Sequence, residues 1–268
     1  LIIHVLSYQS LTQQGRLLYE FNNGDYKLTL AELEQIEDDF PNLTETAMPI
    51  KAMKARYFYL NNQKEKAHKY ALLGAKDNPQ IYFGESLKSQ FFAQEQNQDS
   101  AYYYSKLAFD NVPNNMPHYN LYMNSLINRR DLQEINRAFY YVQSLAGDTS
   151  TIWQIYLRSL ASVLSLGDSF AMSKAAEAFK LFPQNDVIFQ LYRMMTYGQE
   201  RVGKAQQLYQ NANKLYNERN FDEAFNLFNQ AFDLDPLEFS YALNSGLSLY
   251  ESAKYEEAIS YFKIAQNS

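Results

Sequence analysis

Few side chains in this 268-residue sequence are spaced for catalysis or for metal binding. The three histidines, His4, His68 and His118, lie far apart, so no pair has the i, i+4 spacing of a helical metal site. The chain has no cysteine, which excludes disulfides and thiolate metal sites. No nucleophile can be placed beside both a base and an orienting group. We therefore expect no metal, no cofactor and no enzyme activity in these residues.

One glycine-containing segment comes close to a nucleotide-binding motif. It reads Gly198-Gln199-Glu200-Arg201-Val202-Gly203-Lys204-Ala205, which nearly has the spacing of a phosphate-binding loop. Ala205 stands where that motif needs a serine or threonine to hold magnesium, and no strand pattern precedes the segment. The sequence therefore does not predict a phosphate site here.

The formal net charge of −6 is distributed unevenly. Residues 10–47 carry two basic against eight acidic side chains, whereas residues 48–79 carry seven against two. The overall acidity argues against nucleic acid as the main partner. The basic block is either a solvated helix face or a contact for acidic lipid or an acidic partner. It comprises Lys51, Lys54, Arg56, Lys64, Lys66 and Lys69.

The elements that position these side chains are helix pairs, and the C-terminal region repeats one such pair. A triplet of small and aromatic residues recurs after 34 residues: Ala224, Phe228 and Ala231, then Ala258, Phe262 and Ala265. Each triplet has i, i+4, i+7 spacing and so shares one helix face, where the alanines let a neighbouring helix come close. A fixed period of this length indicates stacked repeats.

Helix-ending residues continue the repeat upstream, with one interruption. Pro79, Pro113, Gly147 and Pro183 follow one another at intervals of 34, 34 and 36 residues, but 53 residues separate Pro183 from Pro236. That interval is too long for one hairpin and too short for two. Residues 186–198 are thus expected to form a helix without its own partner, which either stops at Gly198 or continues through Val202.

The interruption suggests a hinge near residues 198–204. We accordingly predict an N-terminal array of about five degenerate pairs in residues 1–199. Residues 200–268 are predicted to form a C-terminal pair of clear units, continuous with the first part or hinged to it. The first pair is the least regular, with helices over residues 10–21 and from about Leu30 through Leu33 and Ile36 to Pro41.

These features resemble the tetratricopeptide repeat family. The resemblance implies an all-α, right-handed solenoid of about seven stacked antiparallel helix pairs. Asn211 departs from the family pattern, which has leucine there, and the last unit lacks its final proline. The repeat-defining packing positions are Ala55, Ala67, Gly74, Ala101, Ala108, Trp153, Ala171, Ala178, Ala212, Ala224, Phe228, Ala231, Pro236, Gly246, Ala258, Phe262 and Ala265.

The same resemblance places the first helix of each pair on an inner groove. Long amides can pair with the backbone of an extended peptide, and tyrosine adds contact area at low entropic cost. A non-catalytic scaffold for a protein or peptide partner is the function this implies, although the same residues would serve equally as solvated helix surface. The expected groove residues are Arg56, Gln90, Asn120, Asn124, Gln154, Arg158, Gln190, Met194, Tyr209 and Asn213.

A second resemblance offers an alternative. Residues 50–57 and 108–115 are similar to segments in the helical tails of bacterial polytopic membrane proteins of the O-antigen ligase and polymerase type. This chain would then be the tail of an enzyme acting on surface polysaccharide, with catalysis upstream. The apolar residues 1–6 are too few to cross a bilayer, which takes about 20 residues. They are expected to form either an apolar cap or the tail of an upstream membrane segment or signal sequence. The expected location is bacterial and membrane-attached or periplasmic, with the cytoplasm as alternative, and the oligomeric state stays open.

Overall fold

A computed structural model of the chain describes residues 2–266, with side chains from residue 12 onward. Within that range every regular element is an α-helix, and the only extended pairing is an isolated bridge between Leu43 and Pro49. The predicted all-α class of stacked helix pairs is confirmed. The side chains of residues 1–6, for which the sequence offers two roles, lie outside the described part.

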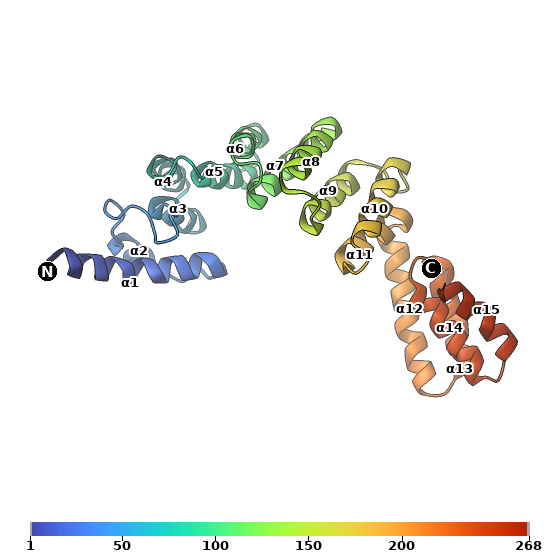
Figure 1. Cartoon of the computed structure of the whole chain (residues 1–268). Helices are drawn as coiled ribbons and strands as arrows, with labels where there is room; N and C mark the ends of the chain where they lie inside the picture. The colour runs from blue at the N-terminus through green and yellow to red at the C-terminus, as the bar shows by residue number, and fades with distance from the viewer. Residues whose placement is uncertain (1, 267–268) are drawn as a thin grey trace. The chain divides into compact units, whose positions relative to one another are not determined.

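The helices form two compact units, Leu1–Asp148 and Thr149–Ser268 (Figure 1). The first contains α1 (Ile2–Asn23), α2 (Leu30–Gln35), α3 (Ile50–Leu60), α4 (Lys64–Asp77), α5 (Phe83–Gln94), α6 (Gln98–Asn111), α7 (Met116–Arg129) and α8 (Leu132–Ala146). The second contains α9 (Ser150–Val163), α10 (Ser169–Leu181), α11 (Asp186–Tyr197), α12 (Gln199–Asn217), α13 (Phe221–Leu234), α14 (Phe239–Glu251) and α15 (Tyr255–Gln266).

This division differs from the predicted one between residues 199 and 200, which falls inside the second unit. The break in the repeat period is present in the structure, but it does not interrupt the packing. Helix α11 contacts α9 and α10 on the side of the preceding pair and α12 on the side of the following pair. An irregular interval in the sequence therefore marks a missing helix rather than a boundary between compact units.

A recurring turn joins the two helices of most pairs. A residue with left-handed backbone follows the first helix at Asn62, Gln96 and Arg130 in the first unit, and at Arg219 and Ala253 in the second. Within each unit these positions are 34 residues apart. The next residue donates its N–H to a carbonyl five positions back, as in the bond from Gln63 to Phe58 at 2.9 Å. This is the Schellman arrangement, which satisfies carbonyls at a helix end.

Small residues allow the paired helices to approach closely. A Cβ on Gly74 of α4 would lie 2.5 Å from the Cβ and from the backbone nitrogen of Ala52 on α3. In the last pair, a Cβ on Gly246 would lie 2.6 Å from the ring of Phe262. Most of the predicted packing positions are buried, whereas Pro236, Phe262 and Ala265 are only partly buried.

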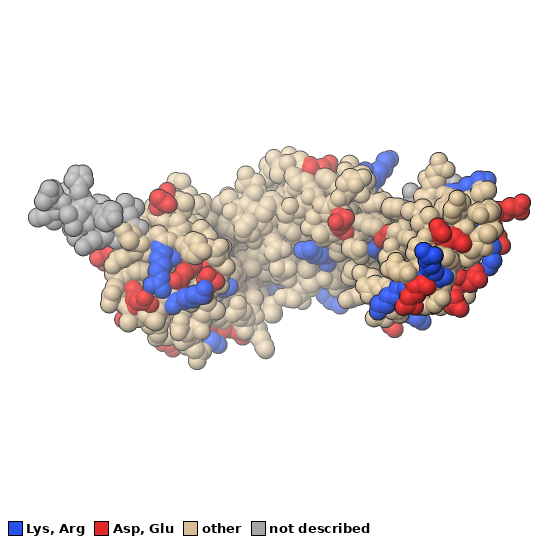
Figure 2. Space-filling view, turned by 90° about the horizontal axis from the view of Figure 1, so that it is seen from below, with Lys and Arg blue, Asp and Glu red and all other residues tan. Residues whose placement is uncertain are grey.

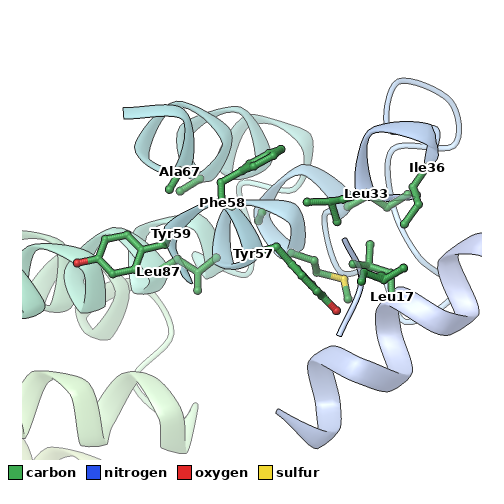
Figure 3. Close-up of a cluster of buried hydrophobic side chains, with 14 of the residues drawn as sticks. Leu17, Leu33, Ile36, Tyr57, Phe58, Tyr59, Ala67 and Leu87 are labelled. Atoms are coloured by element: carbon green, nitrogen blue, oxygen red, sulfur yellow. The ribbon is translucent and has the colours of Figure 1, made fainter. Parts of the chain in front are cut away.

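Aromatic side chains of α3 fill the core of the first unit. Tyr57, Phe58 and Tyr59 are consecutive, so they point to different neighbours around the helix (Figure 3). Phe58 lies beside α4 near Ala67, and Tyr59 stacks on Phe91 of α5 with ring centroids 4.1 Å apart. These aromatic side chains therefore serve inter-helix packing.

A buried carboxylate holds the loop between α1 and α2. Glu20 accepts hydrogen bonds from the backbone N–H groups of Lys27 and Leu28, at 2.7 and 2.8 Å. It also accepts from Arg16 Nε at 2.9 Å and from the Tyr57 hydroxyl at 3.2 Å. Burial raises the pKa of Glu20, but the bonds from Leu28, Arg16 and Lys27 together lower it below its ordinary value.

The second helix of the first pair is shorter than predicted. It ends at Gln35 rather than near Pro41, and Ile36 already has extended backbone. Lys54 of α3 explains the early end, because its ammonium donates to the Ile36 carbonyl and to the Asp38 carboxylate, both at 2.5 Å. A buried cation thus draws residues 36–38 away from a helical path.

We expect Gly74→Ala to lower the free energy of unfolding by about 1–3 kcal/mol, since the new methyl group overpacks the contact between α3 and α4. Gly203→Ala is the matched control. A Cβ on Gly203 of α12 would have no neighbouring atom within 4 Å, so alanine should raise the free energy of unfolding by up to about 1 kcal/mol through its higher helix propensity. Urea unfolding followed by circular dichroism compares the two. Stabilisation by both substitutions would contradict the close approach.

Glu20→Gln should lower the free energy of unfolding by about 1–3 kcal/mol at neutral pH, because a neutral amide accepts the four bonds less well. A carboxylate with a depressed folded-state pKa stabilises above its unfolded pKa, and that stability is lost as the pH falls through the folded value. The difference between native and variant should therefore shrink below about pH 4.3. A difference that stays constant on acidification would refute the assigned role.

Candidate peptide-binding groove

The structure brings two of the predicted groove residues of the first unit into contact. Arg56 on α3 donates to the side-chain oxygen of Gln90 on α5 at 3.2 Å, so these groups satisfy each other. Asn120 and Asn124 lie one turn apart on α7 and are exposed. Asn120 and Asn124 are therefore the exposed amides of this unit's predicted strip, whereas Gln90 is half-buried.

In the second unit several predicted groove residues are used within the fold. Gln154 of α9 donates to Asn185 Oδ1 at 3.2 Å, and Asn213 donates to the carbonyl of Tyr209 at 3.0 Å. The Tyr209 hydroxyl accepts from Asn244 of α14 at 3.2 Å. Arg158 is exposed on α9, one turn beyond Gln154. The remaining two, Gln190 and Met194, lie on α11 and line different pockets.

Helix α11 is a single helix between two pairs, as the broken period predicts. It begins after Asn185, whose side chain accepts from the N–H of Ile188 at 3.0 Å. It ends at Gly198, which has a φ of 87° that favours glycine, and α12 begins at the next residue. The sequence left open whether one helix runs through this point, and the structure shows two.

A groove of about 800 Å³ opens beside α11. Its apolar lining consists of three phenylalanines, two prolines and one leucine, and its polar lining of two glutamines and two acids. The lining residues are Phe179, Pro183, Gln184, Asp186, Phe189, Gln190, Pro236, Leu237, Glu238 and Phe239. They come from the end of α10, the first half of α11 and the turn before α14.

The groove walls have distinct characters. Phe179 and Phe189 stack on each other with centroids 5.1 Å apart, which makes one wall a fixed aromatic surface. Phe239, the first residue of α14, keeps 49% of its surface exposed. An exposed ring beside prolines and amides is the composition expected of a site for an extended peptide.

A second, smaller pocket lies on another face of α11. It encloses about 260 Å³ and is lined mainly by apolar side chains, among them Leu160, Leu166, Leu191 and Met194. Its position suits the insertion of one apolar side chain rather than the passage of a chain. Met194 therefore belongs to this pocket, separately from the groove that holds Gln190.

A buried ion network anchors α11 to the following pair. The guanidinium of Arg193 donates to one carboxylate oxygen of Asp235 at 2.6 Å, to the hydroxyl of Tyr241 at 3.1 Å, and pairs with Glu238 at 2.9 Å. The side chains of Arg193 and Asp235 are 4% and 0% exposed. Burial lowers the pKa of Arg193, but the bond to Asp235 and the surrounding charges outweigh it, so the pKa is raised and the group stays charged.

Sequence reasoning did not identify this network. Ile188 and Met195 have i, i+7 spacing and share one face of α11, whereas Arg193 is five residues from Ile188 and so lies on another side of the helix, where its burial could not be expected. Asp235 directly precedes the helix-ending Pro236, and the sequence indicates no more for it than a place at the end of a helix. Its depth could not be derived from the sequence, because it depends on how α11 packs against the turn after α13.

The structure offers no arrangement for metal or phosphate chemistry in the described residues. No group of three or more potential ligands among His, Asp and Glu is close enough to hold a metal ion there. Residues 199–205, which nearly match a phosphate-binding loop, are helical as part of α12. His118 is buried, and burial lowers its pKa, whereas the ring of His68 contacts Glu95 at 3.2 Å and packs on Phe92.

Three of the six cations in the basic block, which the sequence indicates as either a solvated helix face or a contact for acidic lipid or an acidic partner, are paired with the unit's own acids. Lys54 pairs with Asp38, Lys51 with Asp39 at 2.9 Å, and Lys66 with Glu34 at 2.8 Å. The face drawn in Figure 2 accordingly shows Lys and Arg interspersed with Asp and Glu. Within residues 2–266, moreover, no helix has the length and apolarity needed to span a bilayer.

The geometry defines the chain as an all-α helical-repeat protein built from antiparallel helix pairs. No family model and no curated protein matches it. The chain is similar to a solved structure described as the crystal structure of the APC/C hetero-tetramer Cut9-Hcn1, with 14% identity and a TM-score of 0.45. That alignment covers 93% of this chain and 44% of the other, so this chain spans less than half of it.

A second similar structure is the MamA RS-1 ArsTM double mutant. The identity is again 14%, the TM-score is 0.32, and the alignment covers 67% of this chain and 89% of that one. Neither structure is described as an O-antigen ligase or polymerase, and that resemblance gains no support from them. The repeat assignment depends on the helix pairs themselves, and any function depends on the surfaces described above.

Arg193→Met should lower the free energy of unfolding by about 3–5 kcal/mol, because it leaves Asp235 and Glu238 with uncompensated charge at a buried site. Arg129→Met is the matched control, since the pair of Arg129 with Asp99 is exposed and should be worth under about 1 kcal/mol. Chemical unfolding of both variants gives the comparison. Equal, small losses would mean that the network does not anchor α11.

Proposed function

We propose that the chain is a non-catalytic protein-interaction scaffold, and that the groove beside α11 binds a segment of a partner protein in extended conformation. The observation that carries this proposal is the groove itself. Its volume of about 800 Å³ falls in the range of ligand sites, and its lining combines an exposed ring, prolines and side-chain amides.

The groove walls are held in place before any ligand arrives. The stacked pair of Phe179 and Phe189 fixes one side, and the ion network of Arg193 fixes α11 against the turn that carries Pro236 and Glu238. Binding to a preformed site requires little ordering of the protein, so more of the contact energy appears as affinity. This favours recognition of a flexible segment by a rigid groove.

Two polar side chains in the groove can read the backbone of a bound segment. Gln184 and Gln190 are exposed, and each carries both a donor and an acceptor. Gln190 is one of the residues that the sequence predicts for peptide binding. Asn120 and Asn124 on α7 remain proposed contacts on the first unit, because both amides are exposed.

The test selects linear peptides from a random displayed library against the full chain and measures each one as a free, labelled peptide. We expect Phe239→Ser to weaken binding of the selected peptides by about tenfold or more, as for an aromatic hot spot. Tyr255→Ser is the matched control. Tyr255 also begins a helix, α15, and is 56% exposed, but it does not line the groove.

The groove is supported as the binding site if Tyr255→Ser keeps the peptide affinity within about twofold and Phe239→Ser loses it. Circular dichroism and unfolding midpoints of the two variants should match that of the native chain, because both side chains are about half exposed. Equal binding by all three proteins, or a library without enrichment, would count against the proposed function.

A further inference from the structure

We propose that the partner segment recognised by the groove is basic, with an arginine or lysine side chain that packs on Phe239 and pairs with Asp186. This inference depends on the proposed function, since it concerns the same groove, and it adds the chemistry of the ligand. It starts from the charges of the lining. Asp186 and Glu238 are the charged side chains that line the groove, and both are acidic.

The charge behind the lining does not reverse this sign. Arg193 carries one positive charge and pairs with two acids, Asp235 and Glu238, so the network keeps a negative excess. Arg201 lies near the same turn, but its guanidinium donates to the carbonyls of Leu234 and Asp233, and it does not line the groove. Asp186 is exposed, and it forms no ion pair with the side chains that the structure describes. A cation in the groove would therefore meet an unpaired carboxylate.

The start of α11 does not favour an anion, although helix N-termini generally do. Its N-cap is already made by Asn185, which accepts from Ile188, and Asp186 adds a negative charge in the first turn. Both features offset the positive end of the helix dipole. An acidic segment or a chain-terminal carboxylate would thus approach like charge.

The aromatic lining supplies the second half of the recognition. Arg193 already places its guanidinium 5.2 Å from the centre of the Phe189 ring, which shows that cation and ring pack together in this part of the fold. Phe189 is also stacked against Phe179, so that wall is occupied. Phe239 is the exposed ring of the groove, and it is available to a cation from the partner.

The experiment compares three short labelled peptides of the same length, each with a leucine before and a proline after two central positions. Both central positions hold arginine in the first peptide, citrulline in the second and glutamate in the third. Citrulline keeps the shape of arginine but removes its charge. We expect the arginine peptide to bind the full chain about fivefold or more tighter than the citrulline peptide at low salt, and the preference to weaken as salt screens the exposed pair. The glutamate peptide should bind weakest.

Asp186→Asn should remove most of the preference for arginine over citrulline and reduce its salt dependence. Glu200→Gln is the matched control, because this substitution also removes one negative charge. Glu200 lies, like Asp186, in the first turn of a helix of the same unit, but it does not line the groove. We expect Glu200→Gln to keep the preference within about twofold, as for a distant surface charge.

The possible failures are distinguishable. Equal binding of the arginine and citrulline peptides, with both weakened by Phe239→Ser, would overturn the basic ligand and leave the groove as a peptide site. Preference for the glutamate peptide would overturn the sign of the ligand. Binding of the arginine peptide that neither Phe239→Ser nor Asp186→Asn changes would place it elsewhere and reject the inference.

Discussion

Close approach of helix backbones is the constraint on which the paired helices depend. Where Gly74 of α4 meets Ala52 of α3 there is no room for a Cβ, and alanines occupy equivalent contacts in the other pairs. Small residues at these points let larger side chains, such as Phe58 and Phe228, fill the spaces on either side. In packing of this kind, a substitution that enlarges or shrinks a buried side chain lowers the stability of the fold.

The single helix α11 departs from this scheme and is held by different means. It lacks a hairpin partner, and a buried arginine takes over part of the anchoring that apolar contacts provide elsewhere. A buried ion pair is seldom worth more than the apolar packing it replaces, but it specifies geometry because its partners must meet in one orientation. The position of α11 relative to α13 and α14 is therefore defined by named atoms rather than by shape alone.

The sequence predicted the architecture more fully than the surface. A period of 34 residues, with alanines at i and i+7 around an aromatic residue, sufficed for the helix pairs and for the unpaired helix after Pro183. It did not show that Lys54 ends α2 early, nor that Arg56 and Gln90 satisfy each other. Helical spacing tells which side chains share a face, but whether two faces meet depends on the crossing of helices far apart in sequence.

The location of the groove follows from the broken period. In a regular array each first helix is covered by its own second helix, so the flank of α11 that lines the groove would be buried by a partner that this chain lacks. The interruption leaves Phe189 and Gln190 facing the turn before α14, and it gives Phe239 an exposed ring at the start of that helix. The unpaired helix thus contributes to a concave, partly aromatic surface, and Arg193 anchors it to the turn that precedes α14. A site built on a rigid element in this way can hold a flexible segment at small entropic cost.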